Sequence, residues 1–342
     1  MIGFIDNWNN YLDAIPAKFQ DIYFREEYVK LYETDKEKAC CFVYKDGESV
    51  MLYPFLRRTF EYNGNTYFDF ETAYGYGGPV SNDHSEAFMT TALKSMAENA
   101  QKENFVCGFT RFHPLLENWY YFDKVGRVIH DRKTIAINLK GGIDTTWMNE
   151  IHTKNRNVIK KGEKYGLEFI VDNDFLYLND FEKLYNSTMD KLEADGFYYF
   201  EPKYYEQLKD TISNRFLGIV KYQDKIVAGA VFFYQVPYGH YHLAGSDKES
   251  LKLSPNNFLL WEAAKEMTHR GVEWFHLGGG TDGSEENSLY QYKRKFSKKE
   301  YQFALGKMIF NQSLYNDICS DWAAANPEKV EEFKHILLKY KY

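Results

Sequence analysis

The feature that most constrains the fold of this chain is a repeated order of signals: a hairpin, then a helix, then a strand. A turn at Asp46 separates two apolar runs in the first half, and a turn at Asp224 does the same in the second half. These turns lie 178 residues apart, and the strands after each helix lie 169 residues apart, at Phe105 and Trp274. A nearly constant offset through three successive elements predicts duplicated domains.

Each repeat combines helices with strands that are joined by short turns. We expect strands at 40–44, 50–56, 105–112, 217–222, 226–234 and 272–277. We expect helices at 24–32, 83–102, 144–164, 175–192, 204–212 and 254–269. The last of these begins at Ser254-Pro255, because Ser favours the N-cap and Pro the first helical position. This order indicates an α+β (mixed α/β) fold with largely antiparallel sheets.

The length of 342 residues favours about two domains. The expected boundary lies near Leu139–Ile143, which gives one domain at 1–142 and a second at 143–311. Because no low-complexity linker separates the halves, we expect them to pack closely. A cleft between packed domains is the default place for a ligand.

Composition narrows the classes of partner. Aromatic residues make up 18% of the chain, with 29 Tyr, and Tyr suits grooves that are both apolar and hydrogen-bonding. The net charge of −7 argues against non-specific wrapping of nucleic acid, so we expect no DNA partner. Four cysteines without CxxC spacing indicate reduced thiols in a cytoplasmic protein. No signal peptide or membrane-spanning run is expected.

The segment 276–296 has the highest density of chemistry. It joins a strand end at His276, three glycines that include Gly279, the carboxylate of Asp282 and a cationic-aromatic run with Tyr292 and Lys293. Backbone N–H groups, a carboxylate and positive charge in one volume suit a phosphate or a developing oxyanion. The alternative for the glycines alone is a flexible turn at a sheet end. The segment is not a P-loop, since no Lys-Ser/Thr follows at the required spacing.

Two other segments are candidate binding surfaces. Arg156, Lys160 and Lys164 recur at helical spacing, which indicates either a solvated face or a site for a diphosphate or tRNA phosphates. The run from Tyr74 through Tyr76 to Pro79 interleaves rings with glycines. It is either a loop that packs its rings on the core or the wall of a groove for a sugar, nucleobase or peptide.

Other catalytic arrangements find little support in the sequence. His240 and His242 share a strand face, but no third ligand stands at a recognisable spacing, so we expect no metal. No Ser-His-Asp, Cys-His or GxSxG arrangement stands out. A covalent enzyme intermediate is therefore not favoured, and direct attack on a bound substrate needs only positioning, deprotonation and oxyanion support. Asp282 and His276 are the candidate proton acceptors.

The order of these motifs resembles the Fem family of aminoacyltransferases, its FemX branch above all, and the Fem-like acyltransferases with two tandem GNAT-like domains. The resemblance rests on segments 74–79, 154–161, 245–246, 275–280 and 289–296. It implies two GNAT-like domains with an interdomain cleft, and a final helical stretch, 312–342, that folds back to complete the first domain. It also implies transfer of an aminoacyl or acyl group to an amine of a cell-wall precursor.

The resemblance assigns roles to the candidate residues. Lys293 supports acyl transfer electrostatically, Tyr292 stacks or donates a hydrogen bond, and Lys295 contacts phosphate or solvent. The donor is aminoacyl-tRNA or acyl-CoA, with no permanently bound cofactor, and the acceptor is a UDP-linked or lipid-linked cell-wall or glycan precursor. Peripheral contact with a membrane is compatible with such an acceptor.

Two alternatives stay open. One is an acyl-CoA-dependent N-acyltransferase that acts on an amino sugar of surface polysaccharide synthesis. The Gln/Arg-x-x-Gly-x-Gly/Ala pattern that grips the coenzyme pyrophosphate is absent before the helix at Ser254-Pro255, which counts against this reading. The other is a non-catalytic binding module, which would keep the fold and groove without needing Lys293.

Overall fold

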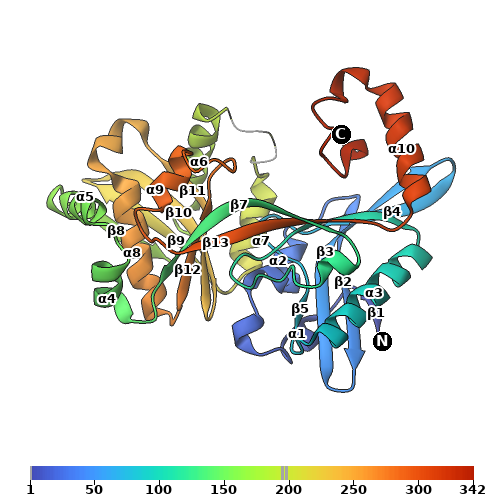
Figure 1. Ribbon diagram of the computed structural model, residues 1–342. Helices are drawn as coiled ribbons and strands as arrows, with labels where there is room; N and C mark the ends of the chain where they lie inside the picture. The colour runs from blue at the N-terminus through green and yellow to red at the C-terminus, as the bar shows by residue number, and fades with distance from the viewer. Residues whose placement is uncertain (1, 194–195, 197–198) are drawn as a thin grey trace. The chain divides into compact units, whose positions relative to one another are not determined.

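The computed structural model describes residues 2–193, 196 and 199–342 (Figure 1). Packing of the chain forms two compact units. Unit 1 comprises the residues up to Asp131 together with Gln302–Tyr342, and unit 2 comprises Arg132–Tyr301. The C-terminal segment thus packs with the first unit. The domain bounds 1–142 and 143–311 stay a prediction.

Unit 1 is built on a mostly antiparallel sheet in the order β1-β2-β3-β4-β6-β13, with β5 paired to β3. Only β4 and β6 run parallel within this unit's described strands. The strands are β1 (Gly3–Ile5), β2 (Glu37–Asp46), β3 (Ser49–Tyr62), β4 (Asn65–Glu71), β5 (Val80–Ser81), β6 (Phe105–Arg111) and β13 (Glu300–Ile309). The helices are α1 (Asn9–Leu12), η1 (Ala17–Phe19), η2 (Ile22–Phe24), α2 (Glu26–Lys30), α3 (Glu86–Lys102), η3 (Phe122–Lys124), α10 (Gln312–Ala325), η6 (Pro327–Lys329) and η7 (Lys339–Lys341).

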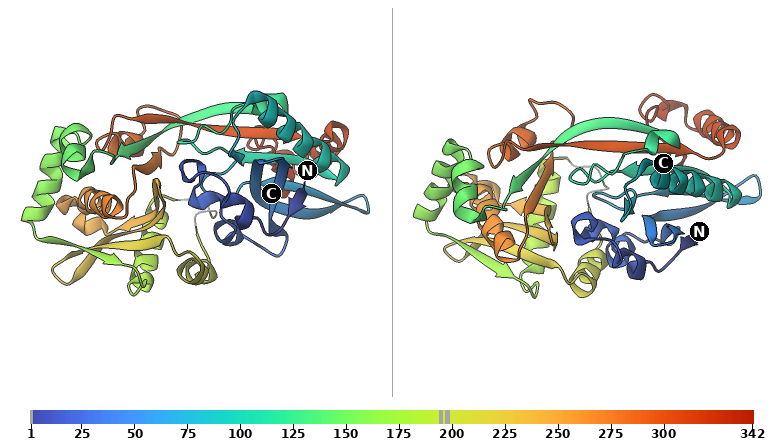
Figure 2. Two further views of the ribbon diagram at one scale, coloured as in Figure 1. Left: turned by 90° about the horizontal axis from the view of Figure 1, so that it is seen from below. Right: turned by 60° about the horizontal axis from the view of Figure 1, so that its bottom comes forward.

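Helix α3 covers one face of this sheet, as Figure 1 and the two views of Figure 2 show. Ser85 caps it, because the Ser85 hydroxyl accepts the Phe88 N–H at 3.4 Å. Its apolar side chains recur every three or four residues and are buried against the strands. The unit 1 core therefore lies between α3 and the sheet.

Unit 2 repeats this plan with the strand order β7-β12-β11-β10-β9-β8. All neighbouring pairs are antiparallel except β11 and β12. The strands are β7 (Arg127–Asn138), β8 (Leu167–Asp172), β9 (Arg215–Tyr222), β10 (Lys225–Gln235), β11 (Tyr238–Ser246) and β12 (Trp274–Gly279). The helices are α4 (Gly142–Asn149), α5 (Thr153–Lys164), α6 (Leu178–Lys191), α7 (Pro202–Thr211), η5 (Lys248–Leu253), α8 (Pro255–His269) and α9 (Ser288–Lys293).

These sheets and their helices confirm the α+β fold that the sequence predicted. Both hairpins form where expected, as β2–β3 and β9–β10. Helix α8 is buried along much of its length, with an apolar face against the unit 2 sheet. No helix in the described part of the chain is both long enough and apolar enough to cross a bilayer.

Two expectations about helices were wrong in detail. The helix expected at 144–164 is interrupted, because His152 takes an extended conformation and its imidazole accepts the Lys154 N–H at 3.2 Å, which starts α5 anew. Ser254 does stand before α8, with Pro255 at the first helical position. However, Ser254 has a left-handed backbone (φ 56°) and its side chain makes no cap hydrogen bond. Pro255 starts this helix without help from a side-chain cap.

Candidate active site

The parallel strands β11 and β12 of unit 2 separate partway along their length. They pair from Tyr238 opposite Trp274 to His240 opposite His276. Beyond that point β11 stays with β10 as far as Ser246, and β12 stays with β7 as far as Gly279. No pairing between them follows in the described residues, so their carboxyl ends part. In open sheets, ligands bind at the carboxyl ends of parallel strands.

Irregularities in the flanking strands accompany this separation. The register of β10 with β11 shifts between Val231 and Phe232, and that of β12 with β7 shifts between His276 and Gly278. Gly278 has a positive φ of 78°, which glycine adopts without strain at such a bulge. Bulges bend a strand locally, and both register shifts occur in the pairings that flank the point where β11 and β12 cease to pair.

The corresponding parallel strands of unit 1 do not separate. Strand β4 pairs with β6 up to Glu71 opposite Phe109, and the Thr72 N–H then donates to the Phe109 carbonyl at 3.0 Å. The Gly77 N–H continues the contact to the Arg111 carbonyl at 2.7 Å. The two units therefore differ at the place where a ligand would enter a sheet, and only unit 2 is open among the described strands.

The glycine run ends β12 and packs closely on its surroundings. A Cβ on Gly279 would come 2.7 Å from the Lys133 carbonyl, and one on Gly280 would come 2.5 Å from Asn287 Oδ1. The Arg132 guanidinium also donates to the Gly280 carbonyl at 3.1 Å. The glycines thus allow close approach of other parts of the protein, and Gly279 presents its carbonyl to Lys293.

Asn287 closes the loop between β12 and α9. Its Oδ1 accepts the N–H groups of Leu289 and Tyr290, both at 3.1 Å, which caps α9. Its Nδ2 donates to Thr281 Oγ1 at 2.7 Å and to Asp282 Oδ2 at 3.0 Å. Asn287 was not among the predicted site residues, although an Asn directly before Ser288 is a recognisable N-cap signal.

Asp282 is exposed and belongs to this same loop. It accepts the Ser284 N–H at 2.8 Å, and this bond, with that from Asn287, holds the pKa of Asp282 below its ordinary value. A carboxylate with a lowered pKa is a weak base. These bonds account for Asp282 as a loop cap, and its role in proton transfer stays a prediction.

Lys293, at the end of α9, is buried with 7% of its surface exposed. Its Nζ donates to the Gly279 carbonyl at 2.8 Å. Burial lowers the pKa of Lys293 to about 7, because removal from water penalises the ammonium form. No carboxylate pairs with it in the described residues. The end of β12 therefore holds a lysine that is close to equally charged and neutral at physiological pH.

Tyr292 precedes Lys293 on α9, and its hydroxyl is buried without a hydrogen-bond partner among the described residues. Its ring meets Phe296 edge-on at 5.6 Å. Burial, with Tyr241 of β11 nearby, raises the pKa of Tyr292 well above its ordinary value. The phenol is thus neutral and has an unused hydrogen-bond donor. A buried donor of this kind is costly unless a ligand satisfies it.

The histidines of β11 and β12 lie at the point where these strands part. His276 is buried on β12, with its ring 5.7 Å from that of His240 on β11. His242 Nε2 and the Tyr204 hydroxyl are 2.7 Å apart. Burial, with His240 nearby, lowers the pKa of His242 to about 3. The substrate role of His276 and the expectation of no metal stay predictions.

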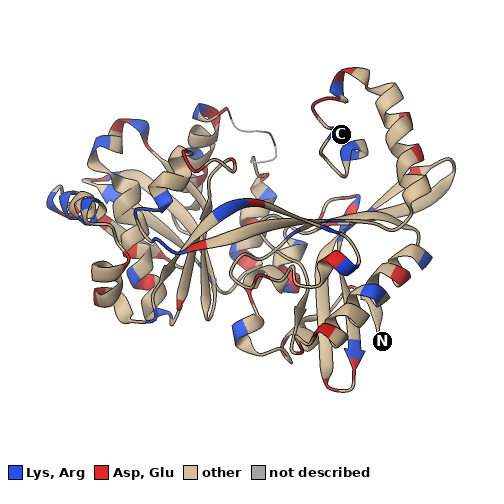
Figure 3. Ribbon diagram, in the orientation of Figure 1, with Lys and Arg blue, Asp and Glu red and all other residues tan. Residues whose placement is uncertain are grey.

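The basic residues of α5, which are blue on the ribbon of Figure 3, make different contacts. Arg156 donates to the Trp147 and Met148 carbonyls, each at 2.9 Å, and so binds the end of α4. Lys160 is exposed, with its Nζ 5.8 Å from the centre of the Trp147 ring. The Lys295 side chain is exposed too, and its carbonyl accepts the His152 N–H at 2.9 Å. The fold thus brings α5 beside the segment that follows Lys293.

Tyr74 and Tyr76 belong to unit 1, where both are half-buried in a cluster of rings. Tyr74 stacks on Tyr32 at 6.1 Å, and its carbonyl accepts the Tyr28 hydroxyl at 2.7 Å. Tyr76 meets Tyr23 edge-on at 5.3 Å. These contacts fit the reading of a loop packed on the core, and the reading of a groove wall stays a prediction.

Comparison with known proteins shows which domain and fold this chain is similar to. Residues 151–294 match the sequence model of an acetyltransferase (GNAT) domain, a range that begins just before α5 and ends just after Lys293. Among solved structures the chain is similar to FemX, with 14% identity over 92% of this chain and 98% of that chain, and a TM-score of 0.71. No curated protein sequence matches the chain.

Two further structures share the fold. One is L-PGS from Bacillus licheniformis, with 14% identity over 84% of this chain and 87% of that chain, and a TM-score of 0.55. The other is the C-terminal domain of a putative lysylphosphatidylglycerol synthetase from Agrobacterium fabrum, with 15% identity over 85% and 88%, and a TM-score of 0.53. The resemblance to Fem-like proteins is thereby confirmed for the fold. The chain therefore has a FemX-like fold, within which residues 151–294 match the model of an acetyltransferase (GNAT) domain.

Proposed function

We propose that unit 2 transfers an aminoacyl or acyl group to the amine of a cell-wall precursor, with Lys293 as the catalytic cation. The observation that carries this proposal is the burial of Lys293 on the carbonyl of Gly279, beyond the point where β11 and β12 part. The preceding residue, Tyr292, has a buried hydroxyl without a hydrogen-bond partner among the described residues, and we assign it the role of a second donor.

The chemistry needs few groups. The acceptor amine attacks the carbonyl carbon of an ester or thioester, a C–N bond forms, and the C–O or C–S bond of the donor breaks. Negative charge develops on the carbonyl oxygen, and a desolvated ammonium stabilises it more than water would. Because the pKa of free Lys293 is about 7, the arriving charge itself favours the protonated form. The amine's proton passes to the departing oxygen or sulfur, relayed by solvent, Asp282 or His276.

The start of α8 supports aminoacyl-tRNA as the donor. Pro255 has no N–H, and the Asn257 N–H already donates to the Ser254 carbonyl at 3.1 Å. This helix start therefore offers few donors for a coenzyme diphosphate. The exposed lysines of α5 and Lys295 instead suit the spaced phosphates of a nucleic-acid strand.

Acyl-CoA is the second candidate donor, favoured by the match of residues 151–294 to an acetyltransferase domain. The likeness to FemX supports a cell-wall precursor as acceptor, and the name of the Agrobacterium fabrum relative indicates an aminoacylated lipid as the alternative product class. A UDP-linked or lipid-linked carrier fits either case.

The test of the catalytic role replaces Lys293 by Met. Transfer of an aminoacyl group from aminoacyl-tRNA to a UDP-linked muropeptide, followed by mass spectrometry, is expected to fall by about 100-fold or more. Binding of the muropeptide, measured by calorimetry, is expected to persist. Lys265→Met is the matched control, because Lys265 lies on α8, is exposed and pairs with Glu262. Unchanged turnover in Lys293→Met would remove Lys293 from the mechanism.

The donor is tested separately with the unaltered protein. Acetyl-CoA and aminoacyl-tRNA are each supplied with the muropeptide and with a UDP-amino sugar. Transfer from acetyl-CoA alone would overturn the aminoacyl-tRNA proposal and leave acyl transfer intact. Binding without transfer from either donor would instead favour a binding module.

A further inference from the structure

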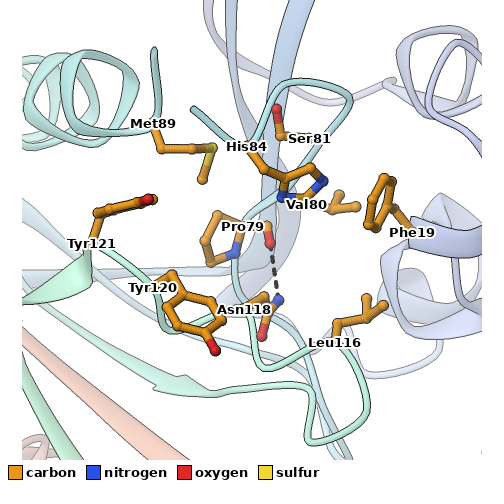
Figure 4. Close-up of a pocket in the computed structure, with 10 residues that line it drawn as sticks. All are labelled: Phe19, Pro79, Val80, Ser81, His84, Met89, Leu116, Asn118, Tyr120 and Tyr121. Carbon is orange, nitrogen blue, oxygen red and sulfur yellow. Dashed lines mark hydrogen bonds between the residues drawn. The ribbon is translucent and has the colours of Figure 1, made fainter. Parts of the chain in front are cut away.

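Unit 1 contains a cavity of 220 Å³ that none of the residues considered above as catalytic lines (Figure 4). Four segments meet around it: the end of η1, the β5 region, the start of α3 and the connection from β6 to β7. Its walls are formed by Phe19, Pro79, Val80, Ser81, His84, Met89, Leu116, Asn118, Tyr120 and Tyr121.

Hydrogen bonds fix the walls of this cavity in place. Asn118 Nδ2 donates to the Gly77 and Pro79 carbonyls, each at 2.9 Å, while its Oδ1 accepts the His113 N–H at 2.8 Å. The Ser81 Oγ lies 2.8 Å from the carbonyl oxygens of both Val50 and Asp83, and its single proton donates to one of them at a time. Such walls are set before a ligand arrives, as in most small-molecule sites.

The lining is apolar, aromatic and free of charge. None of its residues is Lys, Arg, Asp or Glu. The His84 ring lies 4.1 Å from the Phe19 ring, and burial lowers the pKa of His84, so this imidazole is neutral at physiological pH. An ion that entered would lose its hydration without gaining a partner. The chemistry of the walls therefore selects an uncharged group with apolar faces.

One polar group in the lining is unused. The Tyr121 hydroxyl makes no hydrogen bond to other described residues, and Figure 4 shows the Tyr121 side chain directed toward the cavity. The other polar side chains of the lining have partners. Asn118 and Ser81 donate to backbone carbonyls, the Tyr120 hydroxyl donates to Glu117 at 3.3 Å, and His84 is hydrogen-bonded to the Ser81 backbone. A ligand is thus met by aromatic and aliphatic walls and by a single free hydroxyl.

We propose that this cavity of unit 1 binds an uncharged aromatic ring that carries one hydrogen-bonding group at its edge. A cavity of about 150 Å³ lined by apolar side chains holds benzene. The larger cavity here leaves space for a substituent on such a ring, and Tyr121 can hydrogen-bond it. Rings stack and meet edge-on with the aromatic side chains of the wall.

This cavity lies in unit 1, whereas the proposed catalytic residue Lys293 belongs to unit 2. In unit 1 the parallel strands β4 and β6 stay paired. The cavity gives unit 1 a task in recognition rather than in chemistry. It does not depend on acyl transfer, since ring binding is measured without any donor or acceptor. Failure of one proposal therefore leaves the other standing.

The experiment measures binding of p-cresol and toluene to the full chain by saturation-transfer NMR and calorimetry. Leu116→Trp fills the cavity and is expected to abolish binding of both. Leu115→Trp, a neighbouring half-buried leucine outside the lining, is expected to bind both as the unaltered protein does. Tyr121→Phe is expected to weaken p-cresol by about 3- to 10-fold and to leave toluene unchanged, the effect of one lost hydrogen bond.

Several results would overturn the proposal. These are absence of saturation by p-cresol at millimolar concentration, equal binding to Leu116→Trp, or binding of 4-hydroxybenzoate as tight as that of p-cresol. Thermal unfolding of each variant shows whether it is folded. If Leu116→Trp is not folded, Met89→Phe fills the cavity from α3 and is expected to weaken both ligands in its place.

Discussion

At the scale of single residues, Lys293 is the most unusual group of the described structure. A buried lysine without a carboxylate partner holds its charge at a cost, and the partner of Lys293 within the described part of the chain is the Gly279 carbonyl. With a pKa of about 7, Lys293 is present in comparable amounts as ammonium and as neutral amine at neutral pH until an anion binds. An anion that binds beside Lys293 would therefore stabilise its ammonium form, and the ammonium would in turn stabilise the anion.

The pH dependence of stability tests this burial. The pKa of Lys293 is about 7 in the folded chain, against about 10.4 for an unfolded lysine. Between these values the unfolded state binds more protons, so the lysine's contribution to stability rises with pH through this window. Below pH 7 the full cost of charging the buried amine is present. The unfolding free energy lost through this cost is at most about 5 kcal/mol.

The measurement compares urea unfolding of the unaltered protein and Lys293→Met at pH 7 and pH 9.5. Relative to Lys293→Met, the unaltered protein is expected to have a higher unfolding free energy at pH 9.5 than at pH 7. Other titrating groups cancel, because both proteins contain them. A difference independent of pH would show that Lys293 keeps an ordinary pKa.

The contacts between residues of the candidate site could be predicted from the sequence only in part. The sequence placed Gly279 and Lys293 in one motif, but the bond between them depends on Asn287, which folds the intervening loop. The bond of Arg132 to Gly280 joins residues 148 positions apart and leaves no local pattern. Tyr74 and Tyr76 were predicted as ring-bearing loop residues, yet their neighbours Tyr28 and Tyr23 come from α2 and η2.

At the scale of elements, the junction between α4 and α5 shows where periodicity misleads. Trp147, Ile151 and Ile159 fall near one helical face, which predicted a continuous helix. The interruption at His152 is a capping event, and His is not a strong N-cap signal. Arg156, which periodicity assigned to a charged face, satisfies the carbonyls that end α4.

Arg156→Ala is therefore expected to destabilise unit 2 by about 1–3 kcal/mol, through the loss of charge-assisted bonds to those carbonyls. Lys160→Ala on the same helix is expected to change stability by less than about 0.5 kcal/mol, because its side chain is exposed. Chemical denaturation measures both. Equal effects would mean that Arg156 acts only as surface charge.

At the scale of the whole molecule, the constant offset between repeats predicted the two similar sheets, because hairpin, helix and strand each leave a local signal. The packing of the C-terminal segment against unit 1 could not be predicted in this way, because no local pattern marks it. Lys341 Nζ lies 2.6 Å from both Glu37 and Glu71, on β2 and β4. Burial raises the pKa of Glu71, but Arg111 and Lys341 outweigh it and hold that pKa below its ordinary value.

Lys341→Met is expected to lower the unfolding free energy by about 1–3 kcal/mol, since a half-buried Glu71 would keep only Arg111 as a partner. Lys334→Met is the matched control, because its pair with Glu331 is exposed and surface pairs contribute about 0–1 kcal/mol. Urea denaturation at neutral pH gives both values. Equal losses would show that the C-terminal segment does not hold unit 1 through Lys341.

The separated ends of β11 and β12 also bear on how such a protein can diverge. A substitution near Phe109 disturbs hydrogen bonds between β4 and β6, so selection on stability removes it. The facing edges beyond His240 and His276 have no strand-to-strand bonds of that kind to lose among the described residues. New substrate preferences can therefore arise at those edges of unit 2 with little penalty in folding, while unit 1 keeps the molecule intact.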